Sequence, residues 1–259
     1  MRGGSVAAIA CAVACVAAPM AMAFADDVVG VVGSESGAGR GTFSGGGGGT
    51  GAAGDPRAES PLGGDVPAPA MRTSHIPYGP ERLEQMAAYS QRHYGESTWR
   101  LTPRAIVLHY TCGPSYVSAW YTFARNRPHN GEMPGVSAHY IVDRDGTIHE
   151  LVRPDVRCRH TTGMNHVSIG VEFVQRCVRG GARVAEHELL SRDAQMDAGV
   201  RLVRHLQHRF GIGADGVLGH AMANRHPFFL DRLGLTNDHG DWRRGAVREF
   251  LRRVESPGA

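Results

Sequence analysis

The stretch HVSIGVEFV, residues 166–174, predicts a buried β-strand with one acidic side chain in its middle. The residues around that side chain are apolar types that favour strands, namely Ile169, Val171, Phe173 and Val174. Gly170 leaves room for another group to approach the backbone closely. A glutamate in a sheet ordinarily faces solvent on the polar side of its strand. Glu172 therefore has a plain structural interpretation, and a chemical one needs support from elsewhere in the chain.

Helical and strand patterns alternate on both sides of this strand. Helices are predicted at 80–95, 115–126, 192–210 and 241–254, and the third has its apolar residues at the 3.6-residue period. Further strands are predicted at 104–111 and 216–221, and residues 137–152 predict a hairpin that turns at Asp145-Gly146. This alternation predicts an α/β domain with a central mixed sheet that is flanked by helices on both faces.

The N-terminal third of the chain differs in composition from the rest. Residues 1–25 are typical of a secretory signal peptide, with a basic start, a short apolar run and small residues before a cut after Ala25. Residues 26–75 are rich in Gly, Ala, Ser and Pro and predict a disordered linker. We therefore expect one folded domain, residues 76–259, that is secreted, acts outside the cytoplasm and is monomeric.

Neither a membrane anchor nor nucleic-acid binding is expected. Cys11 and Cys15 lie within the predicted signal peptide, but neither follows a leucine-type lipobox, and no second long apolar run is present. The chain of 259 residues has a formal charge of +3, and its basic residues, all arginine, are mixed with acids throughout. Nucleic-acid partners ordinarily require a concentrated basic patch, which this sequence lacks.

Three cysteines remain after the predicted signal cleavage: Cys112, Cys158 and Cys177. An oxidising compartment allows one disulfide and one free thiol among them. The sequence leaves the pairing open. Our hypothesis is a bond between Cys158 and Cys177, because these two flank the strand that contains Glu172.

Histidines and acids occur where strands are predicted to end. His109 lies near the end of strand 104–111, His220 near the end of strand 216–221, and Asp238, His239 and Asp241 follow in TNDHGDW. A catalytic zinc ion typically takes three protein ligands, often His nitrogens and a carboxylate, and leaves one position for water. The chain has fourteen histidines and no compact zinc signature. Taken alone, each histidine is therefore better explained by packing or hydrogen bonding.

Five motifs in order carry a closer resemblance. They are AIVLHYT (105–111), VSAHYIVDRDGTIHELV (136–152), RHTTGMNHVSIGVEFV (159–174), VLGHAMAN (217–224) and TNDHGDW (236–242). Together they closely resemble the zinc-dependent N-acetylmuramoyl-L-alanine amidases of the type 2 amidase and peptidoglycan-recognition superfamily. The resemblance extends over about residues 103–255. It implies a Zn²⁺ cofactor and a peptidoglycan or muropeptide substrate.

The resemblance also implies the metal ligands. It assigns the role of zinc ligand to His109 and His220. The third ligand of the family usually lies two residues after a Lys or Thr. Asp238 fits because it follows Thr236 by two positions. His239 and Asp241 stay open as alternatives, and His226 as a remote one, because the insertion RHPFFLDRLGL lengthens the chain after His220.

The same resemblance implies roles in catalysis and substrate binding. It makes Glu172 the base that takes a proton from water and returns it to the leaving amine, and Thr236 a donor to the oxyanion. On the substrate side it places His139, Tyr140, His160 and Asn165. His139 and Tyr140 are explained equally well as alternating residues of a hairpin strand. His160 and Asn165 are explained equally well as residues that shape a loop.

Two other functions remain open at this stage. Some members of the superfamily bind muropeptides without cleaving them after the loss of a metal ligand, whereas here all three ligand positions can be filled. A zinc peptidase acting on wall peptides would use similar chemistry, but its usual ligand spacings are absent. The sequence therefore favours an enzyme that cleaves the amide between N-acetylmuramic acid and L-alanine.

Overall fold

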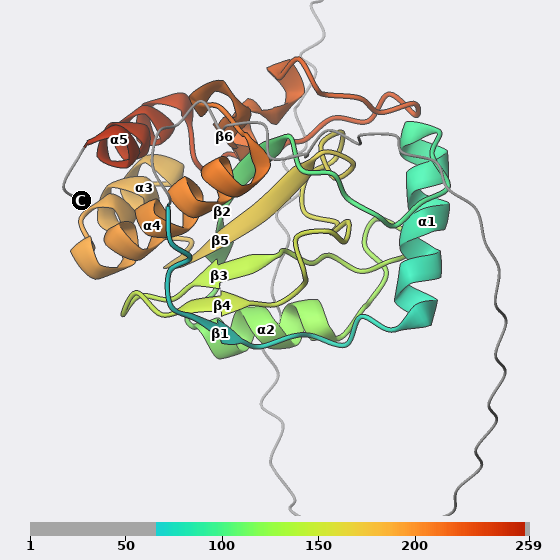
Figure 1. Ribbon diagram of the computed structural model, residues 1–259, viewed down its shortest axis with the longest axis horizontal. Coiled ribbons are helices and arrows are strands. Elements are labelled where there is room, and N and C mark those ends of the chain that lie inside the picture. The colour runs from blue at the N-terminus through green and yellow to red at the C-terminus, as the bar shows by residue number, and fades with distance from the viewer. Residues whose placement is uncertain (1–65, 257–259) are drawn as a thin grey trace, which may run out of the picture. The chain divides into compact units, whose positions relative to one another are not determined.

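The stretch that carries Glu172 forms β5, an interior strand of a six-stranded sheet in the computed structural model, which describes residues 66–256 (Figure 1). The strand order is β1-β4-β3-β5-β2-β6. The β3–β4 pair is antiparallel and the other pairs are parallel, so the sheet is mixed. The strands are β1 (Met71–Thr73), β2 (Ala105–Cys112), β3 (Tyr140–Val142), β4 (Ile148–Glu150), β5 (Ser168–Arg176) and β6 (Val217–Gly219).

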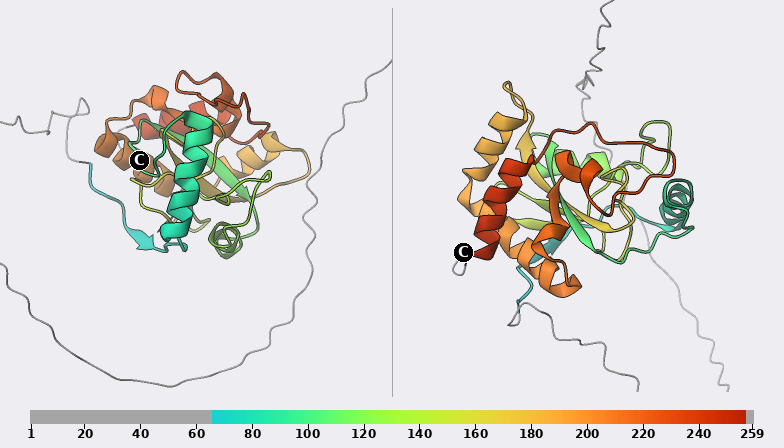
Figure 2. Two further views of the ribbon diagram at one scale, coloured as in Figure 1. Left: turned by 90° about the vertical axis from the view of Figure 1, so that its right-hand side faces the viewer. Right: turned by 90° about the horizontal axis from the view of Figure 1, so that it is seen from above.

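Helices cover both faces of this sheet (Figures 1 and 2). On one face lie α3 (Ala182–Leu190), α4 (Asp193–Phe210) and α5 (Arg244–Glu255), and on the other lie α1 (Pro80–Tyr94) and α2 (Tyr116–Ala124). Two short 3-10 helices, η1 (Ala214–Gly216) and η2 (His220–Arg225), flank β6. The predicted α/β architecture with helices on both faces is confirmed.

The alternation of side chains along the strands separates an apolar face from the face that carries the site. Leu108 and Phe173 belong to the core beneath α4 and α5, so the neighbouring residues His109 and Glu172 point to the opposite face. His109 and Glu172 are also register partners across the β2–β5 pair. An imidazole and a carboxylate are thereby placed side by side in the interior of the sheet.

The described structure begins earlier than predicted and contains a helix that was missed. Residues 71–73 form the edge strand β1, which pairs with β4, although the sequence assigned them to the linker. A three-residue strand is too short to show a periodic pattern. Helix α3 was also not predicted. The predicted signal peptide and most of the predicted linker lie outside the described residues, and among those described no helix is long and apolar enough to cross a membrane.

The disulfide hypothesis is wrong in its pairing. Cys112 is bonded to Cys177 across the ends of β2 and β5, and Cys158 is free. The parallel register explains this, because Cys112 is the partner of Arg176 and Cys177 is the next residue. Cys158 packs instead in the apolar cluster beneath α2, where burial raises the pKa of its thiol to about 12. The bond fixes the ends of the two strands that carry His109 and Glu172.

Candidate metal centre

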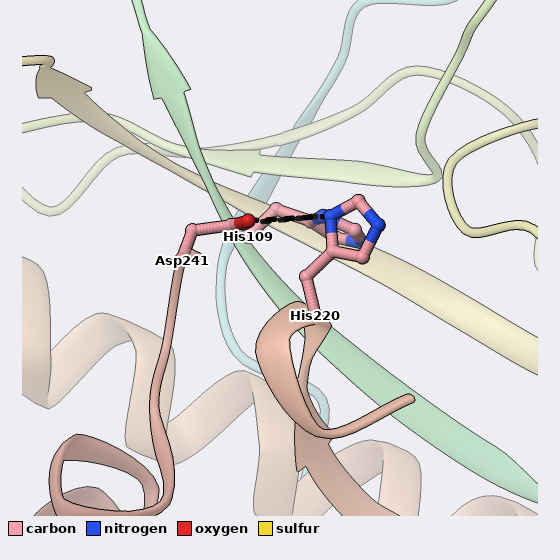
Figure 3. A group of neighbouring side chains, drawn as sticks. All are labelled: His109, His220 and Asp241. Carbon is pink, nitrogen blue, oxygen red and sulfur yellow. Dashed lines mark ion pairs between the residues drawn. The ribbon is translucent and has the colours of Figure 1, made fainter. Parts of the chain in front are cut away.

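Two imidazoles and a carboxylate converge where β2 and β6 end (Figure 3). His109 lies near the end of β2, and His220 follows β6 directly as the first residue of η2. The strands are neighbours in register at Leu108 and Gly219, so the next residue of each is brought to the same place. Asp241 reaches between the two rings, 3.4 Å from His109 Nδ1 and 3.3 Å from His220 Nδ1. All three residues are buried.

The segment that carries Asp241 is held directly against these strand ends. The Ala221 N–H donates to the Asp241 carbonyl at 3.0 Å, and the Trp242 indole donates to the His109 carbonyl at 3.0 Å. Gly219 permits this approach, since a Cβ there would lie 1.7 Å from the Trp242 carbonyl oxygen. A glycine is therefore required at the end of β6 for Asp241 to reach the imidazoles.

A hydrogen bond at Nε2, on the side of the ring away from Asp241, orients His109. The Nε2 atom of His160 lies 3.2 Å from the Ser168 carbonyl, which accepts only if this nitrogen carries the proton. The Nδ1 atom of His160 is then an acceptor, and it lies 3.1 Å from His109 Nε2. His109 therefore holds its proton on Nε2 and directs the lone pair of Nδ1 towards Asp241.

His220 is arranged in the same way. Its Nε2 lies 3.1 Å from Asn237 Oδ1, so the lone pair of Nδ1 also faces Asp241. Burial, followed by the neighbouring His220, lowers the pKa of His109 to about 4, so that ring is neutral at pH 7.

This donor set fits a divalent cation. Two lone pairs and a charged carboxylate face one another in a buried space, and a cation among them would satisfy all three. Neutral imidazoles with one carboxylate are a ligand set of catalytic zinc sites. His109, His220 and Asp241 are thus the residues that could hold such an ion.

Glu172 lies beside this group and is not satisfied by the protein. It is 8 % exposed, and its Oε2 atom is buried without a hydrogen-bond partner. Burial, with a smaller effect of Asp241, raises the pKa of Glu172 to about 8. A buried carboxyl with such a pKa near a metal centre has the properties of a general base or acid.

The structure brings Asp241, and not Asp238, to the two imidazoles. The Asp238 side chain is fully exposed and lies 3.9 Å from the ring of His239. Asp241, left open by the sequence, occupies the position between the imidazoles. The His239 ring stacks on His220 with centroids 4.4 Å apart, and His226 faces the Asp215 carbonyl instead. A loop of this length has no periodicity from which its conformation could be predicted.

Two residues predicted to line the substrate groove are interior residues. His139 accepts a hydrogen bond from the Gly170 N–H at Nδ1 and donates from Nε2 to the Val156 carbonyl, and burial lowers its pKa to about 4. Tyr140 packs in the core beneath α4 and α5. Both are almost fully buried, which favours the alternative of alternating positions in the hairpin.

The other two predicted substrate contacts shape the loop behind His109. Asn165 is buried, and its Oδ1 accepts from the N–H groups of His160 and Thr161. His160 packs against β5 at Gly170, where a Cβ would lie 2.7 Å from the His160 ring. The close approach that Gly170 indicated in the sequence is thus made by His160. Thr236 is exposed on the loop that precedes Asp241.

Sequence reasoning overlooked Asn237. Its carboxamide is the hydrogen-bond partner of a candidate ligand, yet in the sequence it was considered only as the residue between Thr236 and Asp238. No local pattern distinguishes an asparagine that orients a ligand from one that closes a turn.

The family described as N-acetylmuramoyl-L-alanine amidase matches residues 99–234, more than half of the chain. The match includes His109, Glu172 and His220 and ends before Asp241. No curated protein matches the chain.

Solved structures of amidases and endolysins resemble the chain at low sequence identity. PlyL is 17 % identical, with a TM-score of 0.42 and coverage of 72 % of this chain and 98 % of that one. The endolysin LysCS from Clostridium intestinale is 18 % identical, with a TM-score of 0.38 and coverage of 60 % and 91 %. AmiD from E. coli, in complex with a muropeptide substrate, is 22 % identical, with a TM-score of 0.36 and coverage of 46 % of this chain and 49 % of that one.

The geometry leads to a prediction about metal binding. Replacing Asp241 with Ala removes the carboxylate between the imidazoles and is expected to weaken Zn²⁺ binding by more than about 100-fold. Loss of a residue that only contacts a ligand already weakens metal binding by up to about 100-fold, and loss of a ligand should have a larger effect. Asp238→Ala is the matched control and should leave the affinity unchanged. Competition with a chromophoric chelator measures both. Equal loss of affinity in the two variants would be incompatible with the arrangement described.

Proposed function

Because the chain belongs to the family of N-acetylmuramoyl-L-alanine amidases, we propose that His109, His220 and Asp241 hold a Zn²⁺ ion with which it acts. The enzyme is a peptidoglycan hydrolase that cleaves the amide between N-acetylmuramic acid and the L-alanine of the stem peptide. The observation that supports the zinc site is the convergence of two imidazole lone pairs and one carboxylate in a buried space beside Glu172.

The residues of this site divide the chemical work. When bound, Zn²⁺ supplies Lewis acidity, which lowers the pKa of water and polarises a carbonyl group. Glu172 takes a proton from the attacking water and passes it to the amine of the departing peptide. His160 and Asn237 hold the ligand rings in place from behind, through their contacts with the Nε2 atoms. Glu172 lies buried beside the proposed ligands, and its Oε2 atom has no hydrogen-bond partner, so its carboxyl is free to carry this proton.

The role of oxyanion donor moves from Thr236 to His239 in this proposal. The resemblance implies a role for Thr236 only through its position two residues before Asp238. With Asp241 as the ligand, the same spacing selects His239, whose ring stacks on His220 at the exposed side of the site. An imidazole N–H can donate to an oxyanion in its neutral form.

We propose further that the enzyme is secreted and acts on the cell wall. The support is the signal-peptide pattern of residues 1–25, together with the disulfide between Cys112 and Cys177, a bond that forms in oxidising compartments. Binding without cleavage, the alternative left by the sequence, is disfavoured because a complete set of candidate ligands and a buried glutamate are present together.

The reaction itself can be identified from its products. Incubation of the protein with purified muropeptides should release a peptide with a free L-alanine N-terminus and a glycan with a free lactyl carboxylate. Mass spectrometry identifies both products. EDTA should abolish the release and added Zn²⁺ should restore it. Cleavage within the stem peptide would indicate a peptidase instead, and unchanged muropeptides in the presence of Zn²⁺ would indicate a binding protein.

The role of Glu172 is tested by an isosteric change. Glu172→Gln retains the volume of the side chain but cannot accept the proton, so kcat should fall by about 10²–10⁴-fold. The Zn²⁺ content of the purified protein should stay at the wild-type level, because Glu172 is not one of the proposed ligands. A variant that turns over at the wild-type rate would rule out general-base catalysis by this residue.

His239 and Thr236 form a matched pair on one loop. His239→Ala should lower kcat by about 100-fold with little change in KM, as expected for a donor that acts mainly on the oxyanion. Thr236→Ala should leave kcat close to that of the wild type. Steady-state kinetics on a soluble muropeptide measure both variants. The reverse result, a large loss only in the Thr236 variant, would restore the original assignment.

A further inference from the structure

Asn237, which contacts the candidate ligand His220, is itself paired with a second asparagine, Asn224. Asn237 and Asn224 are linked by three hydrogen bonds. The Asn237 N–H donates to Asn224 Oδ1 at 2.9 Å, the Asn224 amide donates to the Asn237 carbonyl at 2.8 Å, and the Asn237 amide donates to Asn224 Oδ1 at 3.0 Å. This pair joins η2 to the loop that leads to Asp241.

These contacts fix which atom of Asn237 faces the imidazole. The orientation of Asn224 is set by the backbone N–H and C=O of residue 237, with which its oxygen and nitrogen pair. The Nδ2 atom of Asn237 donates to the Thr162 carbonyl at 2.8 Å as well as to Asn224. A rotated amide would place an oxygen against two acceptors, so Oδ1 must face His220. The proton of His220 is therefore held on Nε2.

We propose that Asn237 is a positioning residue of the metal centre. It holds His220 with the Nδ1 lone pair directed at the ion, and it links His220 to the loop that orients His109. This inference rests on the proposed zinc function. It adds a residue outside the ligand set, and it explains why one loop serves both ligands. His160 contacts His109 directly, and the Thr162 carbonyl holds Asn237, which contacts His220.

The arrangement also accounts for the length of chain between His220 and Asp241. Residues 226–240 leave η2 and return to the site, and hydrogen bonds of Asn237 with Asn224 and Thr162 hold the returning end in place. Asp231 secures the middle of this segment, because its Oδ2 lies 2.7 Å from His93 on α1 and its Oδ1 accepts from the N–H groups of Leu233 and Leu235. Asp241 is thus positioned by a loop that side-chain hydrogen bonds hold in place, and not by a strand.

The experiment uses the purified protein and Zn²⁺ alone, so it does not depend on substrate. The dissociation constant for Zn²⁺ is measured by chelator competition for the wild type, Asn237→Ala, Asn237→Asp and the control Leu235→Ala. Leu235 is exposed on the same loop. Asn237→Ala should bind about 10–100-fold more weakly, the usual effect of losing an outer-shell partner, and Leu235→Ala should bind like the wild type.

Asn237→Asp separates orientation of the ring from bracing of the loop. Aspartate keeps an acceptor for His220 Nε2 but loses both hydrogen bonds that the Asn237 amide donates, so it should bind Zn²⁺ more tightly than Asn237→Ala. Urea unfolding of the metal-free variants accompanies the measurement and should give similar midpoints for Asn237→Ala and Leu235→Ala.

Three results would overturn the inference. They are wild-type affinity in Asn237→Ala, equal weakness of the Ala and Asp variants, or a loss of affinity in Asn237→Ala that its lower unfolding midpoint fully explains. A wild-type protein that binds no Zn²⁺ would overturn the proposed function together with the inference. Failure of the inference alone is recognised by tight binding in the wild type and in Asn237→Ala alike.

Discussion

The parallel strands β5, β2 and β6 end at one edge of the sheet, and this shared edge determines where polar groups can meet. His109 on β2 is the register partner of Glu172 on β5. His220, which directly follows β6, comes to lie beside His109 because Leu108 and Gly219 are register partners. No single stretch of sequence contains the site. Backbone pairing of three strands brings its parts together, and the disulfide between Cys112 and Cys177 fixes two of those strands where they end.

Burial gives the assembled groups their chemical properties. An imidazole away from water loses its affinity for protons, and a carboxyl away from water gains it. His109 is consequently a neutral ligand, and Glu172 a carboxyl whose pKa is raised to about 8. Asp241 adds a carboxylate between the two imidazoles. The same sheet edge thus provides two nitrogen ligands, one carboxylate oxygen ligand and one proton carrier within a small volume.

The residues whose positions could be predicted are those that lie on or directly after strands. Strand patterns predicted where His109, Glu172 and His220 lie, because the direction of a side chain on a strand follows from its position. Their proposed roles in metal binding and catalysis came from the resemblance. Asp241 could not be distinguished from Asp238, since the conformation of residues 225–240 depends on tertiary contacts such as that between Asp231 and His93. For His139 the resemblance implied a place beside the substrate, whereas in the structure this residue lies just before β3, buried and hydrogen-bonded to the backbone of Gly170 and Val156.

Anomalous diffraction at the zinc absorption edge, from a zinc-loaded crystal of the protein, tests most directly whether His109, His220 and Asp241 bind the ion. We expect one strong anomalous peak, bonded to Nδ1 of His109, Nδ1 of His220 and a carboxylate oxygen of Asp241 at about 2.0–2.2 Å, with Glu172 nearby but not bonded. A peak held by Asp238 or His239 without Asp241, or coordination through the Nε2 atoms, would refute the arrangement on which the proposed chemistry depends.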